Sequence, residues 1–227
     1  GDSEYPWAPS SGGSQTTPSV APAVRDGALK ALERLKQIAA QKLGVKSDEV
    51  TAENKTFKAA GAAGKSISFA DVCRDLRRRS VFHGERSGFA RDQFAFNTFA
   101  AHFAEVEVEP ATGRIRVLRY AAAHDSGRIM NPLTAESQVI GGIVQGLSAG
   151  LFEERIMDSA TGNPVNPNLE DYKIATALDM PEISVQFVDS TDPRLNNLGT
   201  KGLGEPPRIP SSAAIANAVY NAIGVHV

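Results

Sequence analysis

The stretch AEVEVEPATGRIRVLRYAAAHD, residues 104–125, carries the clearest structural signal in the chain. Small and apolar residues alternate with glutamates before the central ATG and with arginines after it. Alternation with a period of two predicts strands that bury one face, and the glycine-containing turn at 111–113 predicts that they form a hairpin. Glutamates opposite arginines on the exposed face suit cross-strand pairing. We expect the second strand to continue through YAAAHD.

A long helix is predicted upstream of the hairpin, where apolar residues recur at spacings of three and four between positions 20 and 43. We place its N-cap at Ser19, because Pro22 then falls in the first turn, where no intrahelical N–H is required. Gly44 supplies the residue type that commonly ends a helix. The sequence therefore predicts one long helix between these two residues.

A second long helix is predicted downstream, beginning at Asn131 and Pro132 and ending near Glu154. One face of it carries a glutamine and three glycines at intervals of four residues: Gln138, Gly142, Gly146 and Gly150. Each glycine costs roughly 1 kcal/mol relative to alanine inside a helix, so something must come close to this face. The close neighbour is either another helix or a ligand.

The remaining pattern predicts short elements: a strand or two around Phe57, a helix at 68–76, a strand at 183–188 and a final helix at 211–223. Strands and helices are interleaved without a strict βαβ rhythm, which favours an α+β fold with mixed sheet layers packed against the two long helices. Residues 1–18 are rich in Pro, Gly, Ser and Thr, and we expect them to form an extended segment beside a ligand. Residues 19–227 would form the α+β body of the same domain.

Composition excludes several classes of function. The formal net charge of -2 gives no electrostatic reason to expect nucleic acid or an anionic membrane as partner, and no apolar stretch approaches the roughly 20 residues of a transmembrane helix. A single cysteine, Cys73, excludes an internal disulfide or a cluster held by several cysteines; we interpret it as a buried apolar residue. The four histidines lack metal-ligand spacing and are interpreted as structural: His83, His102, His124 and His226.

The segment GTKGLGEPP, residues 199–207, is the best candidate for chemistry. Its glycines allow the backbone to approach a bulky ligand, and Pro206 and Pro207 restrict the residues before them, which favours an extended conformation at Glu205 on a stiff loop. A lone carboxylate in such a setting is a candidate general base. An ordinary loop before a helix would use the same residue types.

Two helix starts are candidate phosphate sites, because helix N-termini offer free N–H groups and a positive dipole end. Hydroxyls gather at the first start, in Thr16, Thr17 and Ser19, and Arg128 lies near Asn131 at the second. Helix capping requires the same residue types, so each signal alone is weak.

Four segments together resemble, in order, the C-terminal part of the molybdopterin-binding large subunit in the molybdenum hydroxylase family of aldehyde oxidases and xanthine dehydrogenases. They are APSSGGSQTTPSVAPAV, FAEVEVEPATGRIRVLRY, DSGRIMNPLTAESQVIGGIVQGL and GLGEPP. The resemblance covers essentially the whole chain, and the combination is far more specific than any single motif.

The resemblance implies that Glu205 is the general base. It assigns cofactor contacts to Thr17, Pro18, Ser19 and Val20 at the first helix start, to Arg128, Asn131, Thr134 and Gln138 around the second, and to Lys201, Gly202, Leu203 and Gly204 in the glycine loop. The segment from Arg128 to Thr134 would lie near the pyrophosphate of a dinucleotide form of the cofactor. The glycine face of the second helix would then border the cofactor.

The family resemblance also implies cofactors and partners. The cofactor would be molybdenum-molybdopterin in its cytosine dinucleotide form, with no metal ligand from this chain and with iron–sulfur clusters and FAD on other domains or subunits. The remainder of the molybdenum subunit would complete the site, and the reaction would hydroxylate an aldehyde or N-heterocycle with oxygen from water. The enzyme would be cytoplasmic, or periplasmic if exported folded with a partner subunit. The alternative is a structural module that folds but binds no cofactor and has no activity alone.

Overall fold

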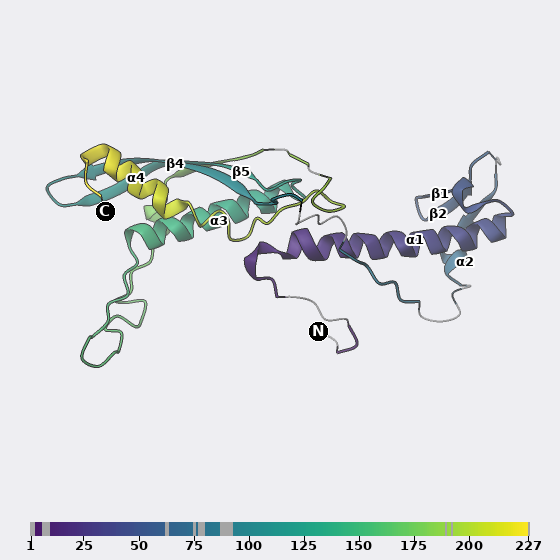
Figure 1. Cartoon of the computed structure of the whole chain (residues 1–227), viewed down its shortest axis with the longest axis horizontal. Coiled ribbons are helices and arrows are strands. Elements are labelled where there is room, and N and C mark those ends of the chain that lie inside the picture. Colours follow the sequence, from purple (N-terminus) through teal and green to yellow (C-terminus); the bar gives the residue numbers. More distant parts are fainter. Residues whose placement is uncertain are drawn as a thin grey trace. The chain divides into compact units, whose positions relative to one another are not determined.

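The computed structural model of the chain describes residues 3–5, 10–61, 64–74, 76, 80–86, 93–188, 190–191 and 193–226. The chain divides into two compact units (Figure 1). Gly1–Pro18 and Ala90–Val227 form the first, here called the hairpin unit, and Ser19–Phe89 forms the second, here called the helix unit. Within the described part of the chain, no helix combines the length and apolar character needed to cross a membrane.

The sheet of the hairpin unit has three strands in the order β4-β5-β6. The predicted hairpin is confirmed: β4 (Phe99–Glu109) and β5 (Arg114–Asp125) pair antiparallel around a turn in which Gly113 has a φ of 73°. The expected later strand is confirmed as β6 (Glu182–Phe187), which lies parallel to β5. The sheet is therefore mixed, as predicted.

Cross-strand ion pairs lie on the exposed face of the hairpin. Arg119 Nε lies 2.6 Å from Glu105 Oε2, and Arg116 Nη2 lies 2.8 Å from Glu107 Oε2. Exposed pairs of this kind contribute at most about 1 kcal/mol each. They support the register of the two strands more than the stability of the unit.

The opposite face of the sheet packs against α3 (Pro132–Leu151) and α4 (Ser211–Ile223), which lie on the same side of the hairpin in Figure 1. Asn131 caps α3 by accepting the Thr134 N–H, and Pro132 opens its first turn. Both predicted helices are thus confirmed. The buried core residues are Val117, Tyr120, Ala122, Val139, Ile143, Leu147, Ile215 and Val219.

The glycine face of α3 packs against the segment that leads into α4. Gly142 lies against Pro207, Gly146 against Ser211 and Gly150 against Ser212. A Cβ at Gly142 would lie 2.6 Å from Pro207 Cβ, which is closer than real Cβ atoms approach. The expectation that this glycine face borders the cofactor is therefore wrong, because the space is filled by the protein's own backbone and side chains. Of the four residues on this face, Gln138 lines the pocket that is described in the next subsection.

The helix unit consists of α1 (Ala21–Leu43), a three-stranded antiparallel sheet and a short helix. The strands are β1 (Val50–Glu53), β2 (Thr56–Ala59) and β3 (Ser66–Ser68), followed by α2 (Phe69–Cys73). The expected strands around Phe57 and the short helix are confirmed. Its buried core residues are Ile38, Ala39, Ala40, Val50, Phe57 and Val72. Cys73 is half-buried, less enclosed than the sequence suggested.

The start of α1 differs from the prediction, whereas its end agrees. A π-helical turn at Thr16–Val20 precedes the helix, and Val20 occupies the N-cap without a side-chain cap bond. Ser19 is buried inside that turn, so its assignment as the N-cap is wrong. Pro22 does lie in the first turn, and Gly44 ends the helix in the left-handed region at a φ of 70°. Short 3-10 turns occur at Gly12–Ser14, Ser47–Glu49 and Ala177–Asp179.

Candidate functional site

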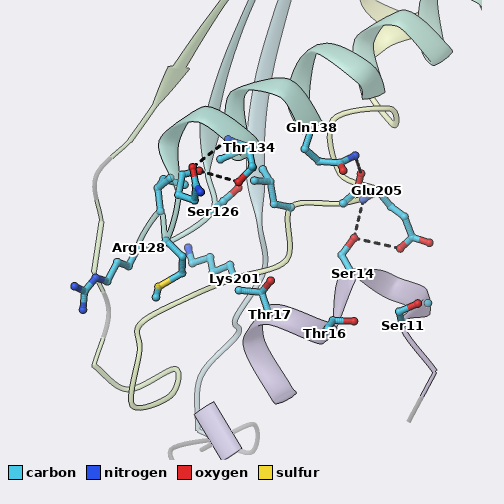
Figure 2. A pocket seen from close by; sticks show the side chains of 17 residues that line it. Ser11, Ser14, Thr16, Thr17, Ser126, Arg128, Thr134, Gln138, Lys201 and Glu205 are labelled. Carbon is cyan, nitrogen blue, oxygen red and sulfur yellow. Dashed lines mark hydrogen bonds between the residues drawn. The ribbon is translucent and has the colours of Figure 1, made fainter. Parts of the chain in front are cut away.

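A pocket of about 530 Å³ lies within the hairpin unit (Figure 2). Three segments line it. They contribute Ser11, Gly12, Ser14, Thr16 and Thr17 from the N-terminal segment; Ser126, Arg128, Ile129, Met130, Asn131, Thr134, Ala135 and Gln138 from the end of β5 and the start of α3; and Lys201, Leu203, Gly204 and Glu205 from the glycine loop. The lining combines apolar surface with side-chain hydroxyl and amide groups, which suits a ligand that carries several oxygen and nitrogen atoms.

Backbone hydrogen bonds attach the glycine loop to the end of β5. The Lys201 N–H donates to the Ser126 carbonyl across 2.9 Å, and the Arg128 N–H donates to the Gly199 carbonyl across 2.8 Å. Gly127 lies between them with a φ of 65°, and a Cβ there would collide with the Gly199 carbonyl oxygen. The close approach therefore requires glycine at 127.

Asn196, a buried residue, ties the N-terminal segment to the same loop. Its side-chain amide donates to the carbonyls of Thr200, at 2.9 Å, and of Pro18, at 3.4 Å. Its carbonyl oxygen accepts the N–H groups of Leu198 and Thr200. The Thr200 hydroxyl also reaches the Thr17 carbonyl, at 3.5 Å. One asparagine thus organises two pocket walls.

Glu205 is anchored by Ser14, a residue that the sequence did not single out (Figure 2). The Glu205 N–H donates to Ser14 Oγ across 2.7 Å, and the Ser14 hydroxyl donates to Glu205 Oε2 across 3.4 Å. Ser14 has a φ of 55°, which is uncommon for a residue other than glycine. A Cβ on Gly202 would lie 2.9 Å from Ser14 Cβ, and one on Gly204 would lie 3.2 Å from Ser14 Oγ. The two loop glycines therefore make room for Ser14.

Two further side chains hold the loop that leads to Glu205. Gln138 Nε2 donates to the Gly204 carbonyl across 3.0 Å, and Thr98 Oγ1 donates to the Gly202 carbonyl across 2.7 Å. Gln138 comes from α3, and Thr98 precedes β4. The carboxylate of Glu205 itself is exposed on a backbone that is fixed from several sides.

Lys201 forms an ion pair with Asp125, with 2.6 Å between Nζ and Oδ2 and exposed fractions of 14% and 26% for the two side chains. Asp125 also accepts from the Ser190 hydroxyl and the Gly127 N–H. Burial pushes the pKa of Asp125 up, but the hydrogen bonds from Lys201, Ser190 and Gly127 outweigh it and hold that pKa below its usual range. The charge of Lys201 is thus partly compensated inside the protein.

The wall near the start of α3 has features of an anion site. Ser126 is buried, and its Oγ has no hydrogen-bond partner among the described residues although it belongs to the pocket lining. A buried hydroxyl without a partner costs about 1–3 kcal/mol. The α3 N-terminus supplies a positive dipole end, and the exposed Arg128 lines the same wall. A phosphate bound here would meet all three groups.

The structure brings most of the predicted site residues together. Those that line the pocket are Thr17, Arg128, Asn131, Thr134, Gln138, Lys201, Leu203, Gly204 and Glu205. Pro18 and Gly202 are not lining residues but offer their carbonyls to Asn196 and Thr98. Ser19 and Val20 belong to the helix unit and do not line the pocket, so a cofactor contact at these two positions stays a prediction.

Sequence reasoning missed Ser14, Thr98, Asp125, Ser126 and Asn196. Asp125 and Ser126 stand in a quoted segment, and only the pairing of the glycine loop with β5 shows their part in the site. Among the residues that the structure describes, no three His, Cys, Asp or Glu side chains come together as a set of metal ligands.

Comparison with known proteins gives a consistent result. Residues 1–181 match the sequence profile of the molybdopterin cofactor-binding domain. The chain is 45% identical over 140 residues to the aldehyde oxidoreductase molybdenum-binding subunit PaoC of Escherichia coli (strain K12), which covers 62% of this chain and 19% of that protein. It is 41% identical over 160 residues to the putative xanthine dehydrogenase molybdenum-binding subunit XdhA of the same strain, which covers 68% of this chain and 21% of that protein.

Solved structures agree on the fold. Reconstituted CO dehydrogenase from Oligotropha carboxidovorans matches with a TM-score of 0.81 and 21% identity, covering 99% of this chain and 29% of that one. The chain thus spans about a fifth of the length of the two curated relatives. Because the profile matches well over half of its residues, the chain belongs to the molybdopterin cofactor-binding domains of the molybdenum hydroxylase family, which includes aldehyde oxidoreductases and xanthine dehydrogenases.

Proposed function

We propose that the hairpin unit forms one wall of a molybdopterin site in an oxidoreductase that hydroxylates aldehydes or N-heterocycles, with Glu205 as general base. The observation that carries the proposal is the anchoring of Glu205. Its backbone N–H is fixed by Ser14, and its exposed carboxylate belongs to a residue that lines the pocket. A general base must be held within reach of the proton it accepts, and the fixed backbone beneath an exposed carboxylate supports this role for Glu205.

The residues present fit the cofactor of the family. The wall formed by Ser126, Arg128 and the start of α3 suits phosphate, and we assign it to the pyrophosphate of a cytosine dinucleotide form. Asn131 and Thr134 would lie beside that phosphate. Gln138 and the loop 201–204 would contact the pterin, with Lys201 oriented by its ion pair with Asp125.

The chemistry divides between the cofactor and this chain. When bound, the molybdenum cofactor supplies the two-electron oxidation of the substrate with oxygen that derives from water. Glu205 accepts the proton released in that reaction. Since the Ser14 hydroxyl donates to Oε2, we assign the proton transfer to Oε1. The fixed loop keeps this oxygen in place between turnovers, which lowers the entropic cost of the step.

The proposal includes partners outside this chain. The remainder of the molybdenum subunit would supply the opposite wall and the substrate pocket, and iron–sulfur and flavin domains or subunits would receive the electrons. The names of the curated relatives support this division, because each is a molybdenum-binding subunit of an oxidoreductase.

Glu205→Gln in the cofactor-loaded enzyme tests the assignment. Loss of a general base costs roughly a hundredfold to ten-thousandfold in turnover, and the molybdenum content should stay at the wild-type level. Glu136→Gln is the matched control, since Glu136 is exposed on α3 beside the pocket but is not among its lining residues. Turnover of the Glu205→Gln enzyme within a few-fold of the control would rule out this base.

A further inference from the structure

The face of the β4-β5-β6 sheet that points away from α3 and α4, here called the outer face, changes character along the hairpin. Toward the turn, the outer face carries glutamates and arginines that form cross-strand ion pairs. Toward the pocket, it carries Phe99, Ala101 and Phe103 on β4 and Ala121 and Ala123 on β5. These positions alternate along each strand with residues that face the helices. One side of a single hairpin is therefore charged in one half and apolar in the other.

The apolar half of the outer face is exposed in the part of the chain that the structure describes. Phe99 and Phe103 have exposed fractions of 71% and 67%, and Ala121, which lies opposite Phe103, is also exposed. An antiparallel sheet with one solvated face normally carries polar side chains there, as the other half of this hairpin does. Single exposed apolar residues need no explanation, but two phenylalanines beside a row of alanines form a contiguous patch, and such patches mark interaction surfaces.

A hollow of about 380 Å³ lies on the outer face at the border between its two halves. One row of cross-strand neighbours in it consists of Phe103, Ala121 and Ser184, so one large side chain stands next to two small ones. The small side chains leave the space that forms the hollow. A large apolar side chain of a partner would fill this space, as anchor residues do in protein interfaces.

A charged row at the edge of the hollow gives the partner a second property. Arg119 lies opposite Glu105 on β4 and opposite Glu182 on β6, and its Nε is 2.6 Å from Glu105 Oε2. Two carboxylates thus flank one guanidinium, which leaves this row with an excess negative charge. A lysine or arginine of the partner beside Glu182 would complement that charge.

The apolar half of the outer face adjoins the candidate cofactor pocket. Thr98, which directly precedes Phe99, donates to the Gly202 carbonyl of the glycine loop across 2.7 Å. Asp125, which lies opposite Phe99 on β5, is paired with Lys201 of the same loop. A body that covers Phe99 would therefore lie beside the glycine loop.

We infer that the apolar half of the outer face is the surface on which the remainder of the molybdenum subunit docks, with a large apolar side chain in the hollow and a lysine or arginine at Glu182. The regions similar to this chain make up 19% and 21% of the two curated relatives, so most of each of those subunits lies outside them. One body that completes the pocket and covers the adjoining sheet accounts for both open surfaces. A second copy of this chain fits less well, because a symmetric contact would place two rows of excess negative charge in one interface.

The inference rests on the proposed division of the cofactor site between this chain and the remainder of the subunit, and it does not depend on the role of Glu205. The test places photoreactive p-benzoylphenylalanine at position 103 of the purified, cofactor-loaded enzyme with its complete molybdenum subunit. The replacement keeps an aromatic ring, and a wild-type molybdenum content confirms assembly. Irradiation should cross-link position 103 to a peptide of the molybdenum subunit outside residues 1–227, which mass spectrometry identifies. The same photoreactive residue in place of Glu107 is the matched control and should lose this cross-link, because Glu107 lies on the same strand and face in the charged half.

Glu182→Lys tests the charged row independently. The variant should release its molybdenum on dilution about tenfold faster than the wild type, because like charges brought together in an interface weaken it by at least this factor. Glu107→Lys is the control, since Glu107 also lies opposite an arginine on the outer face but away from the hollow. Cross-links from position 103 only within residues 1–227 or only to another subunit would overturn the inference, and so would no cross-link or equal molybdenum release in the two lysine variants. An active Glu205→Gln enzyme that keeps the expected cross-link would remove the proposed base and leave the docking surface in place.

Discussion

The N–H of Glu205 donates to the hydroxyl oxygen of Ser14 across 2.7 Å, although 191 positions separate the two residues in the sequence. The contact joins the polar N-terminal segment to the glycine loop. It explains why Gly202 and Gly204 lack side chains, since a Cβ at either position would press against Ser14. The candidate base is therefore held by a residue from the opposite end of the chain.

Ser14→Ala should lower turnover of the cofactor-loaded enzyme about three- to tenfold while molybdenum content stays unchanged. The substitution removes the acceptor for the Glu205 N–H and the donor to its carboxylate, and a neutral hydrogen bond contributes about 1 kcal/mol. Steady-state kinetics with metal analysis measures both quantities. Ser11→Ala is the control, because Ser11 lines the same pocket but does not anchor Glu205 as Ser14 does. Equal activity in the two variants would show that Ser14 does not position the base.

Gly142→Ala should destabilise the protein by about 1–3 kcal/mol, the usual cost of overpacking. The added Cβ would lie 2.6 Å from Pro207 Cβ and 3.1 Å from the Arg208 nitrogen. The neighbouring Gly141→Ala is the matched control, because nothing lies within 4 Å of a Cβ there. Helix propensity then predicts a gain of up to about 1 kcal/mol for the control. Thermal unfolding of both variants measures the difference, and equal melting temperatures would refute close packing at Gly142.

Stability should fall as the pH is lowered from about 6.5 to about 4. Burial and the nearby His124 lower the folded-state pKa of His102 to about 4 from an ordinary value of 6.5, so the unfolded chain binds a proton in this window that the folded chain does not. The free energy of unfolding falls by at most about 1.4 kcal/mol per pH unit for one proton. Above pH 6.5, the contribution of His102 to stability no longer depends on pH. Chemical denaturation at several pH values measures the slope.

His102→Asn provides the comparison for the pH series, because it removes the titrating group and keeps a polar side chain. The slope between pH 4 and 6.5 should be shallower in this variant than in the wild type. A wild-type slope equal to that of the variant would show that His102 titrates normally in the folded protein. His124, whose pKa burial also lowers, adds to the slope in both proteins.

Local patterns were sufficient to predict the hairpin and the second helix. Alternation in residues 104–125 reflects one buried face of β4 and β5, and this signal needs only neighbouring residues. Asn131 and Pro132 similarly predicted the start of α3 from short-range capping chemistry. The first helix was predicted well at Gly44 but not at Ser19, because a π-helical turn at Thr16–Val20 takes the place of a side-chain cap.

Contacts between distant segments could not be predicted. The glycines of α3 showed that something lies close to the helix, but periodicity does not tell whether the neighbour is Pro207 or a ligand. The sequence around Ser14 gave no indication of its role, because its partner Glu205 is distant in the sequence and comes close only in the folded chain. His102 and His124 lack metal-ligand spacing in the sequence, and their contact arises from the pairing of β4 with β5.

The central claim is that the molybdenum cofactor binds beside Glu205. Anomalous scattering at the molybdenum absorption edge, measured on crystals of the cofactor-loaded enzyme, tests this claim most directly. The account predicts a molybdenum peak at the pocket lined by Ser14, Gln138 and Glu205, with the Glu205 carboxylate within reach of a proton on the reacting oxygen. Cofactor phosphate should lie at the wall formed by Ser126 and the start of α3. Molybdenum distant from this pocket, with Glu205 facing solvent, would contradict the account and would favour a purely structural module.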